Sequence, residues 1–178
     1  MRRSTFHVAL VILMGVATFT IFLPVPSSPK NNSNGPVLGT GTKVKNCRLQ
    51  GALPDPDCTP GVALSGITAQ EICSPEFSAS QETSSTGVLE QLYFQYSLIP
   101  DHTEPYYVDH LISLSLGGSD DMANLWPQRT EPRPGYNEKN RVEKYLHEEV
   151  CSGRMSLESA QQQVASNWIR VFLSMPSF

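Results

Sequence analysis

The middle of the chain runs through two short extended segments, a glycine turn and a helical stretch. Residues 106–112 are rich in aromatic and aliphatic side chains, which predicts a strand. A Gly-Gly-Ser turn signal follows at 117–119, and residues 124–126 indicate a short second strand that Pro127 ends. Residues 138–150 place apolar side chains on one helical face. We therefore expect a two-stranded ribbon followed by a helix.

Helical patterns flank this predicted ribbon on both sides. Residues 87–96 carry apolar side chains at helical spacing. A second apolar stripe runs through residues 157–172, directly after Ser156, a residue type that caps helices. Residues 47–75 are dense in prolines and turn residues, which predicts irregular structure. The expected fold class is α+β, with the elements in the order helix, ribbon, helix, helix.

The N-terminus has the composition of a targeting segment. Two arginines precede an apolar run over residues 6–23, and a charged region followed by such a run is typical of a secretory signal. We expect residues 1–26 to be a signal peptide or an N-terminal membrane anchor, and the protein to be secreted or anchored facing outside the cytosol. Residues 27–45, rich in Ser, Asn, Gly and Pro, are expected to form a flexible linker to a domain over 46–173.

The four cysteines form an even set, which favours disulfides in an exported protein. Their spacing does not match a paired CxxC zinc site. Three connectivities are possible for four cysteines. Of these we expect one local bond and one long-range bond, Cys47–Cys58 and Cys73–Cys151.

The chain carries a formal net charge of -4 over 178 residues. Tight nonspecific binding to nucleic acid usually needs a basic surface, because neutralised phosphates release counterions. Four basic side chains could contact phosphates: Lys139, Arg141, Arg129 and Arg133. Neighbouring glutamates dilute that patch, so each is expected to be solvated surface. A hydrolase that releases its substrate quickly tolerates weaker binding, so the charge does not exclude an enzyme.

The candidate site lies within the ribbon and the helix after it, and its residues come in a fixed order: Asp109, His110, Asn124 and Asn140. Cleaving a phosphodiester requires a base for water and a cation that neutralises charge in the transition state. Histidine suits the first task, and Asp and Asn oxygens are ligands that Mg²⁺ accepts. Because adjacent strand residues point to opposite faces, a site that uses both Asp109 and His110 requires a bend, or opposite sides of the phosphate.

The same segments resemble a family of secreted HNH-like endonucleases, which have a ββα-metal fold. The family pattern runs LPDP-CTPG, IC, DHLIPLELGGS, NLWPQ, a KD-x-x-E helix, VC-G and AQ before a Trp. This chain has LPDPDCTPG, IC, DHLISLSLGGS, NLWPQ, KNRVE, VCSG, AQ and NW in the same order, over about Cys47 to Trp168. The resemblance implies a small ββα-metal (HNH-like) core with flanking helices and a disulfide-stapled N-terminal loop region.

The resemblance also implies a role for each candidate residue. His110 would be the general base, Asp109 the first metal ligand, and Asn124 would pin the loop between the strands. Asn140 would be the metal ligand from the helix, and Glu143, one turn later, could join the metal shell. The implied activity is hydrolysis of phosphodiester bonds in nucleic acid, DNA or RNA, with one Mg²⁺ or Mn²⁺ ion.

Three positions depart from the family pattern, which has Pro, Glu and Asp where this chain has Ser113, Ser115 and Asn140. The amide at position 140 removes one negative charge beside the ion, which would lower the metal affinity. These changes and the acidic net charge leave open a second hypothesis, a non-catalytic exported module that keeps the fold as a binding scaffold. A toxin-type nuclease with a cognate inhibitor is a further alternative, although no obligate protein partner is evident from the sequence.

Overall fold

The computed structural model describes residues 38–79, 86–99 and 106–176. The expected signal peptide or anchor, and most of the expected linker, lie outside these residues. The described part holds a two-stranded sheet and five α-helices, which confirms the predicted α+β class. None of the helices in this part is long and apolar enough to span a membrane.

The sheet is a ribbon of two antiparallel strands, β1 (Tyr107–His110) and β2 (Leu125–Gln128), with Asp109 opposite Trp126. Both strands form where the sequence predicts them. The prediction that Pro127 ends the second strand is wrong, because β2 continues through it. In a two-stranded ribbon, alternate N–H groups point away from the partner strand, so a proline at such a position removes no ladder hydrogen bond.

Two glycines fix the loop between the strands, next to a short 3₁₀ helix, η1 (Leu114–Leu116). Gly117 has a φ of 73°, a left-handed conformation that glycine adopts without strain. At Gly118 a side chain has no room, because a Cβ atom there would lie 1.8 Å from the carbonyl oxygen of Ile112. The turn predicted at 117–119 therefore forms, and its conformation requires glycine at both positions.

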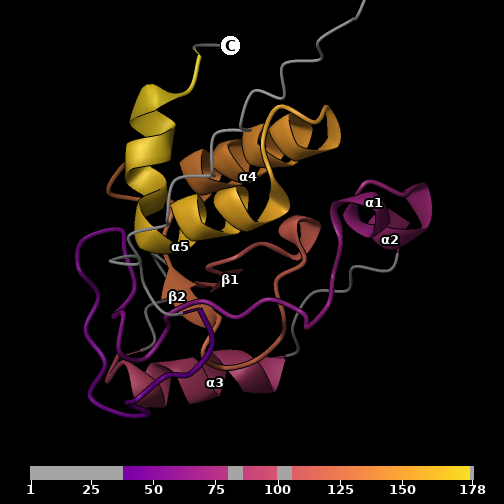
Figure 1. The fold of residues 1–178 in the computed structure, drawn as a ribbon. Coiled ribbons are helices and arrows are strands. Elements are labelled where there is room, and N and C mark those ends of the chain that lie inside the picture. The colour runs from indigo at the N-terminus through magenta and orange to yellow at the C-terminus, as the bar shows by residue number, and fades with distance from the viewer. Residues whose placement is uncertain (1–37, 80–85, 100–105, 177–178) are drawn as a thin grey trace, which may run out of the picture. The chain divides into compact units, whose positions relative to one another are not determined.

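The three long helices form close to their predicted positions. Figure 1 shows the ribbon between α3 (Thr86–Gln95) on one side and the pair α4 (Tyr136–Cys151) and α5 (Leu157–Ser174) on the other. The side chain of Ser156 accepts a hydrogen bond from an amide in the first turn of α5, as predicted for a helix cap. α4 packs against α5 and η1, so this helix reaches the ribbon and its loop.

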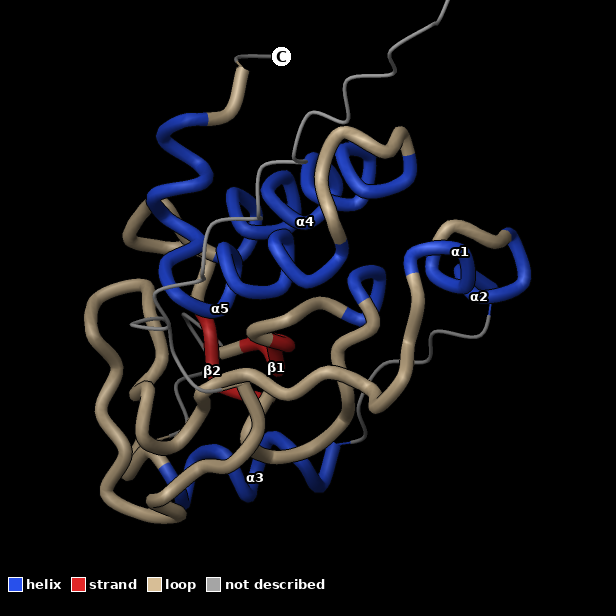
Figure 2. Tube along the Cα trace, viewed as in Figure 1, coloured by secondary structure: helices blue, strands red, loops and turns tan. Residues whose placement is uncertain are grey.

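The region predicted to be irregular contains a short helix, α1 (Ala69–Ile72), and a second short helix, α2 (Pro75–Ala79), begins at its last residue. They follow a long loop in Figure 2, and α1 contacts the long helix α4. Thr68 and Glu71 form a reciprocal capping box that starts α1. This pair of residues satisfies two backbone N–H groups at once, which stabilises a helix too short to show an apolar period.

Two disulfides brace the loop region, one within it and one to α4. Both predicted pairings are confirmed: Cys47 is bonded to Cys58, and Cys73 is bonded to Cys151. The second bond joins the C-terminal end of α1 to the last residue of α4. Residues 38–45 belong to the expected linker, and the amides of Thr42 and Lys43 donate to the carbonyl of Asp57, which attaches this part to the loop region.

Candidate active site

Asp109 is held on the ribbon by two donors. The residue is 5% exposed, and its Oδ2 accepts a 2.8 Å hydrogen bond from the indole nitrogen of Trp126, its partner across the ribbon. The ammonium of Lys139 on α4 lies 2.9 Å from the same oxygen. Both donors come from packed elements, so the orientation of this carboxylate is fixed.

The prediction that Lys139 is solvated surface is wrong, because its side chain is fully buried. Its ammonium pairs with Asp109 and Glu143 and donates a 2.6 Å hydrogen bond to the carbonyl of His110. Burial alone would lower the pKa of Lys139, but the two carboxylate charges outweigh that effect and raise the pKa. The site therefore contains a built-in positive charge at neutral pH.

Glu143 lies one turn after Lys139 on α4 and contacts its ammonium. Burial raises the pKa of Glu143 to about 7, with the charge of Lys139 opposing this rise and the charge of Asp109 adding to it. The helix therefore brings a second acid, which titrates near neutral pH, to the carboxylate on β1. The i, i+4 spacing of Lys139 and Glu143 is the feature of the sequence from which this ion pair could have been predicted.

His110 follows Asp109 on β1, yet its ring has a different partner. Its Nε2 lies 2.8 Å from Oδ1 of Asp120, a residue of the loop between the strands. The side chain of His110 is 10% exposed, and that of Asp120 is 70% exposed. Within the described residues no hydrogen bond joins the His110 ring to Asp109, as expected for neighbours on a regular strand. Asp109 and His110 are instead connected by Lys139, whose ammonium contacts the Asp109 carboxylate and donates to the backbone carbonyl of His110.

Asn124 is fully buried and uses its whole amide to fix the loop between the strands. Its Oδ1 accepts from the amides of Ile112 and Val62, and its Nδ2 donates to the carbonyls of Ile112 and Ser119. Three of these bonds join the start and the end of the loop that follows His110, and the fourth links this loop to Val62. The side chain therefore acts on the site through the backbone and does not face the Asp109 carboxylate.

Asn140 is exposed on α4, beside the buried Lys139. In the described part of the chain its side chain makes no hydrogen bond, and it is not among the contacts of Asp109 or His110. The structure therefore brings together Asp109, Lys139, Glu143 and the backbone of His110. It leaves the amide of Asn140 at the solvent side of the helix.

Two oxygens of this cluster have the chemistry of ligands for a divalent cation. Oδ1 of Asp109 and Oε2 of Glu143 have no hydrogen-bond partner among the described residues. Lys139 contacts the other oxygen of both groups, and Trp126 contacts that of Asp109. Carboxylate and amide oxygens are the donors that Mg²⁺ and Mn²⁺ take. The two carboxylate oxygens are therefore of a kind that binds such an ion, whereas Asn140 lies on the solvent side of α4. The positive charge of Lys139 opposes cation binding.

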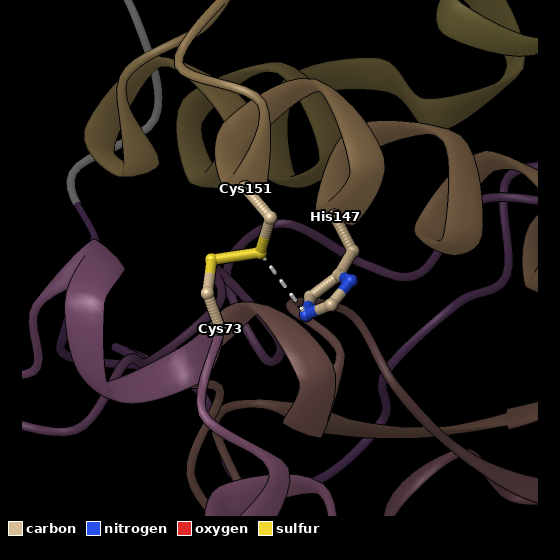
Figure 3. Close-up of side chains that lie close together, drawn as sticks. All are labelled: Cys73, His147 and Cys151. Atoms are coloured by element: carbon tan, nitrogen blue, oxygen red, sulfur yellow. Dashed lines mark hydrogen bonds between the residues drawn. A yellow bond between two sulfur atoms is a disulfide. The ribbon is translucent and has the colours of Figure 1, made fainter.

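A second group of potential ligands, Cys73, His147 and Cys151, lies at the end of α4 (Figure 3). Nε2 of His147 is 3.5 Å from Sγ of Cys151 and 3.2 Å from the carbonyl oxygen of Ile72. The two sulfurs are bonded to each other, whereas a metal is bound by thiolates. In this oxidised form the group is therefore a covalent link between α1 and α4.

Comparisons with known proteins give no match to this chain: no family model, no curated protein and no solved structure.

Proposed function

We propose that the protein hydrolyses phosphodiester bonds in nucleic acid, with DNA as the favoured substrate, through an HNH-like ββα-metal core and one Mg²⁺ or Mn²⁺ ion. The observation that carries this proposal is the clamped pair of carboxylates. Asp109 on the ribbon and Glu143 on the following helix are held together by Lys139 next to His110. The strand, strand, helix order of these elements also supports it.

His110 is the proposed general base, and its contact with Asp120 supports Nδ1 as the nitrogen that acts. A carboxylate only accepts hydrogen bonds, so Nε2 carries the proton when it bonds to Oδ1 of Asp120. In a neutral ring, Nδ1 then keeps its lone pair, and within the described residues Nδ1 has no hydrogen-bond partner. This nitrogen is free to accept a proton from water.

The other residues position the reacting groups. Asn124 fixes the loop that follows His110, and Lys139 and Trp126 fix the carboxylate of Asp109. A bound divalent ion would supply positive charge that stabilises the phosphorane-like transition state. Oδ1 of Asp109 would hold that ion, with Glu143 as the donor available on α4.

Plasmid cleavage tests this function directly. The oxidised protein is expected to convert supercoiled plasmid to the nicked form in Mg²⁺ or Mn²⁺, and to leave it intact in EDTA. Product ends can then be resolved on a denaturing gel. A folded protein that cleaves neither plasmid, single-stranded DNA nor RNA in either metal would show that this proposal is wrong.

The position of Lys139 favours a second candidate, a non-catalytic binding module, because an ammonium already neutralises the carboxylate of Asp109. Melting temperature in Mg²⁺ or Mn²⁺ separates the two candidates. A ligand at 100 times its Kd stabilises the folded state by about 2.7 kcal/mol, so the nuclease is expected to melt several degrees higher with the metal. Sodium chloride at the same ionic strength is the control, and a shift equal to the control supports the binding module.

A further inference from the structure

Tyr107 and Tyr136 stack on each other at one end of the contact between β1 and α4. Their ring centroids are 5.0 Å apart, and the ring planes are inclined by 22°. Tyr107 is the first residue of β1, and Tyr136 is the first residue of α4. The pair therefore joins the two elements that carry the carboxylates of the candidate active site, Asp109 and Glu143.

Residue spacing places the tyrosine pair on the same faces of β1 and α4 as the candidate active site. Tyr107 precedes Asp109 by two residues, so their side chains share one face of the ribbon. Tyr136 precedes Lys139 by three residues, so their side chains share one face of α4. The ion pair of Lys139 with Asp109 shows that these two faces are turned toward each other. The stacked rings are thus the next contact along β1 and α4 from the candidate site.

The spacing from the tyrosine pair to Asp109 corresponds to one or two nucleotides. Two residues of strand span about 7 Å, and three residues of helix span about 4.5 Å. Consecutive nucleotides in one strand of DNA rise by about 3.4 Å. A nucleic acid strand with a phosphate at Asp109 can therefore place a neighbouring base at the tyrosine rings.

Tyr107 is accessible to a ligand, although it lies beside a buried site. The residue is 43% exposed, whereas Asp109 is 5% exposed and Tyr136 is half-buried. In the described part of the chain the other exposed aromatic residue is Phe94, which lies on α3. The contact with Tyr136 limits the orientations of the Tyr107 ring, so a base that stacks on it orders less of the protein.

Stacking is also a form of binding that suits an acidic protein. The chain has a net charge of -4, so counterion release by basic side chains supplies less binding free energy than on a basic surface. Stacking depends on contact between flat rings, and it contributes roughly 5- to 150-fold in affinity per base. Beside Tyr136, Glu138 lies 3.7 Å from the guanidinium of Arg133, so the charge next to the rings is balanced.

We propose that Tyr107, supported by Tyr136, is a stacking site for one base of the substrate strand, one or two nucleotides from the phosphate held at Asp109. The inference rests on the proposed nuclease function and names its substrate class as unpaired nucleic acid. A base within a duplex is covered on both faces by its neighbours, whereas a base in a single strand is free to stack on a side chain. Because every base has a flat face, the site accepts all four bases.

The test measures binding of a fluorescein-labelled single strand, octathymidylate, to the full chain in EDTA, by fluorescence anisotropy. Tyr107→Leu is expected to raise the Kd roughly 5- to 150-fold, because leucine is apolar but has no flat ring. Tyr107→Phe and Tyr107→Trp should keep the affinity, because each retains a ring. Octauridylate beside octathymidylate separates RNA from DNA as the source of the strand.

An abasic strand distinguishes stacking from a structural role of Tyr107. An abasic octamer keeps the phosphate charges of octathymidylate and removes the groups that stack. The unsubstituted protein and Tyr107→Leu should bind this octamer equally weakly. If Tyr107 only held α4 or Asp109 in place, the substitution would weaken the binding of both strands alike.

Phe94→Leu is the matched control, because Phe94 is an exposed aromatic residue on α3, across the ribbon from α4 in Figure 1. This variant should bind both strands with the affinity of the unsubstituted protein. Tyr107→Leu is expected to fold, since the residue is exposed, and thermal melting of each variant checks this.

An unchanged Kd in Tyr107→Leu, an equal loss on the abasic strand, or no binding by the unsubstituted protein would overturn the stacking site. Cleavage of plasmid and of single-stranded DNA in Mg²⁺, measured on the same preparations, keeps the two proposals apart. Metal-dependent cleavage with an unchanged Kd means that the nuclease stands and the stacking site falls. Base binding that depends on Tyr107, without cleavage of any nucleic acid, means that the stacking site stands and the nuclease falls.

Discussion

His110→Ala is expected to lower the rate of phosphodiester cleavage roughly 100- to 10,000-fold, the usual contribution of a positioned general base. The expectation follows from the single described contact of its ring, which leaves Nδ1 able to accept a proton from water. The fold should persist, because that contact is made with an Asp120 side chain that is 70% exposed. The measurement is the initial rate of plasmid nicking at saturating metal, with a thermal melt of each variant.

His147→Ala provides the matched control for this substitution. This histidine is half-buried on α4, and its ring contacts the carbonyl of Ile72 and the sulfur of Cys151 rather than the ribbon. Its variant should cleave at the unsubstituted rate. A His110 variant that is as active as the His147 variant would exclude His110 as the base, even if the protein proves to be a nuclease.

Lys139→Met is expected to reduce the free energy of unfolding by roughly 3–5 kcal/mol at pH 7, because it leaves buried carboxylates without their counter-charge. Methionine fills similar space, so the loss reports the charge rather than a cavity. The side chain is fully buried and contacts Asp109, Glu143 and the carbonyl of His110. Urea denaturation followed by circular dichroism gives the value.

The pH dependence of this loss identifies its cause. Burial already raises the pKa of Glu143 to about 7, and removal of Lys139 takes away the charge that opposes this rise. A carboxyl whose pKa is raised on folding destabilises the fold at pH values where it ionises, and the penalty fades by about 1.4 kcal/mol per pH unit as pH falls. Below pH 7 Glu143 is protonated in both folded proteins, so its contribution to the gap between variant and unsubstituted protein should appear above pH 7 and widen there by up to about 1.4 kcal/mol per pH unit.

Lys144→Met is the control for this second prediction. The Lys144 side chain is 79% exposed and lies 3.9 Å from Glu148, so its loss should change the free energy of unfolding by less than about 0.5 kcal/mol. If Lys139→Met were as mild, the ammonium could not be the buried counter-charge of Asp109.

The elements set by local chemistry were predictable from the sequence, and Pro127 shows where that approach fails. The helix predicted over 138–150 forms as α4 (Tyr136–Cys151), and the cap at Ser156 forms as expected. Both depend on residues close in sequence. Whether a proline ends a strand depends on which side the partner strand lies, and that is a tertiary property.

The same distinction applies to the candidate site. The pattern of residues 106–112 was enough to place Asp109 on the ribbon, and the family resemblance implied that Asn124 fixes the loop after it. The burial of Lys139 was not visible, because lysine is rarely buried and its carboxylate partner on β1 is distant in sequence. Helix rotation also decides that Lys139, and not its neighbour Asn140, faces the ribbon.

Cys73 and Cys151 are 78 positions apart in the sequence, and the bond between them closes a covalent ring. Both strands and α4 lie on that ring. A single break of the backbone anywhere between the two cysteines would leave both fragments on one molecule. The ribbon and the helix that carry Asp109 and Glu143 would then remain a unimolecular pair, able to re-form at a rate independent of protein concentration. The domain should therefore stay in one piece after a single proteolytic cut within the ring. Reduction of the Cys73–Cys151 bond would remove this protection.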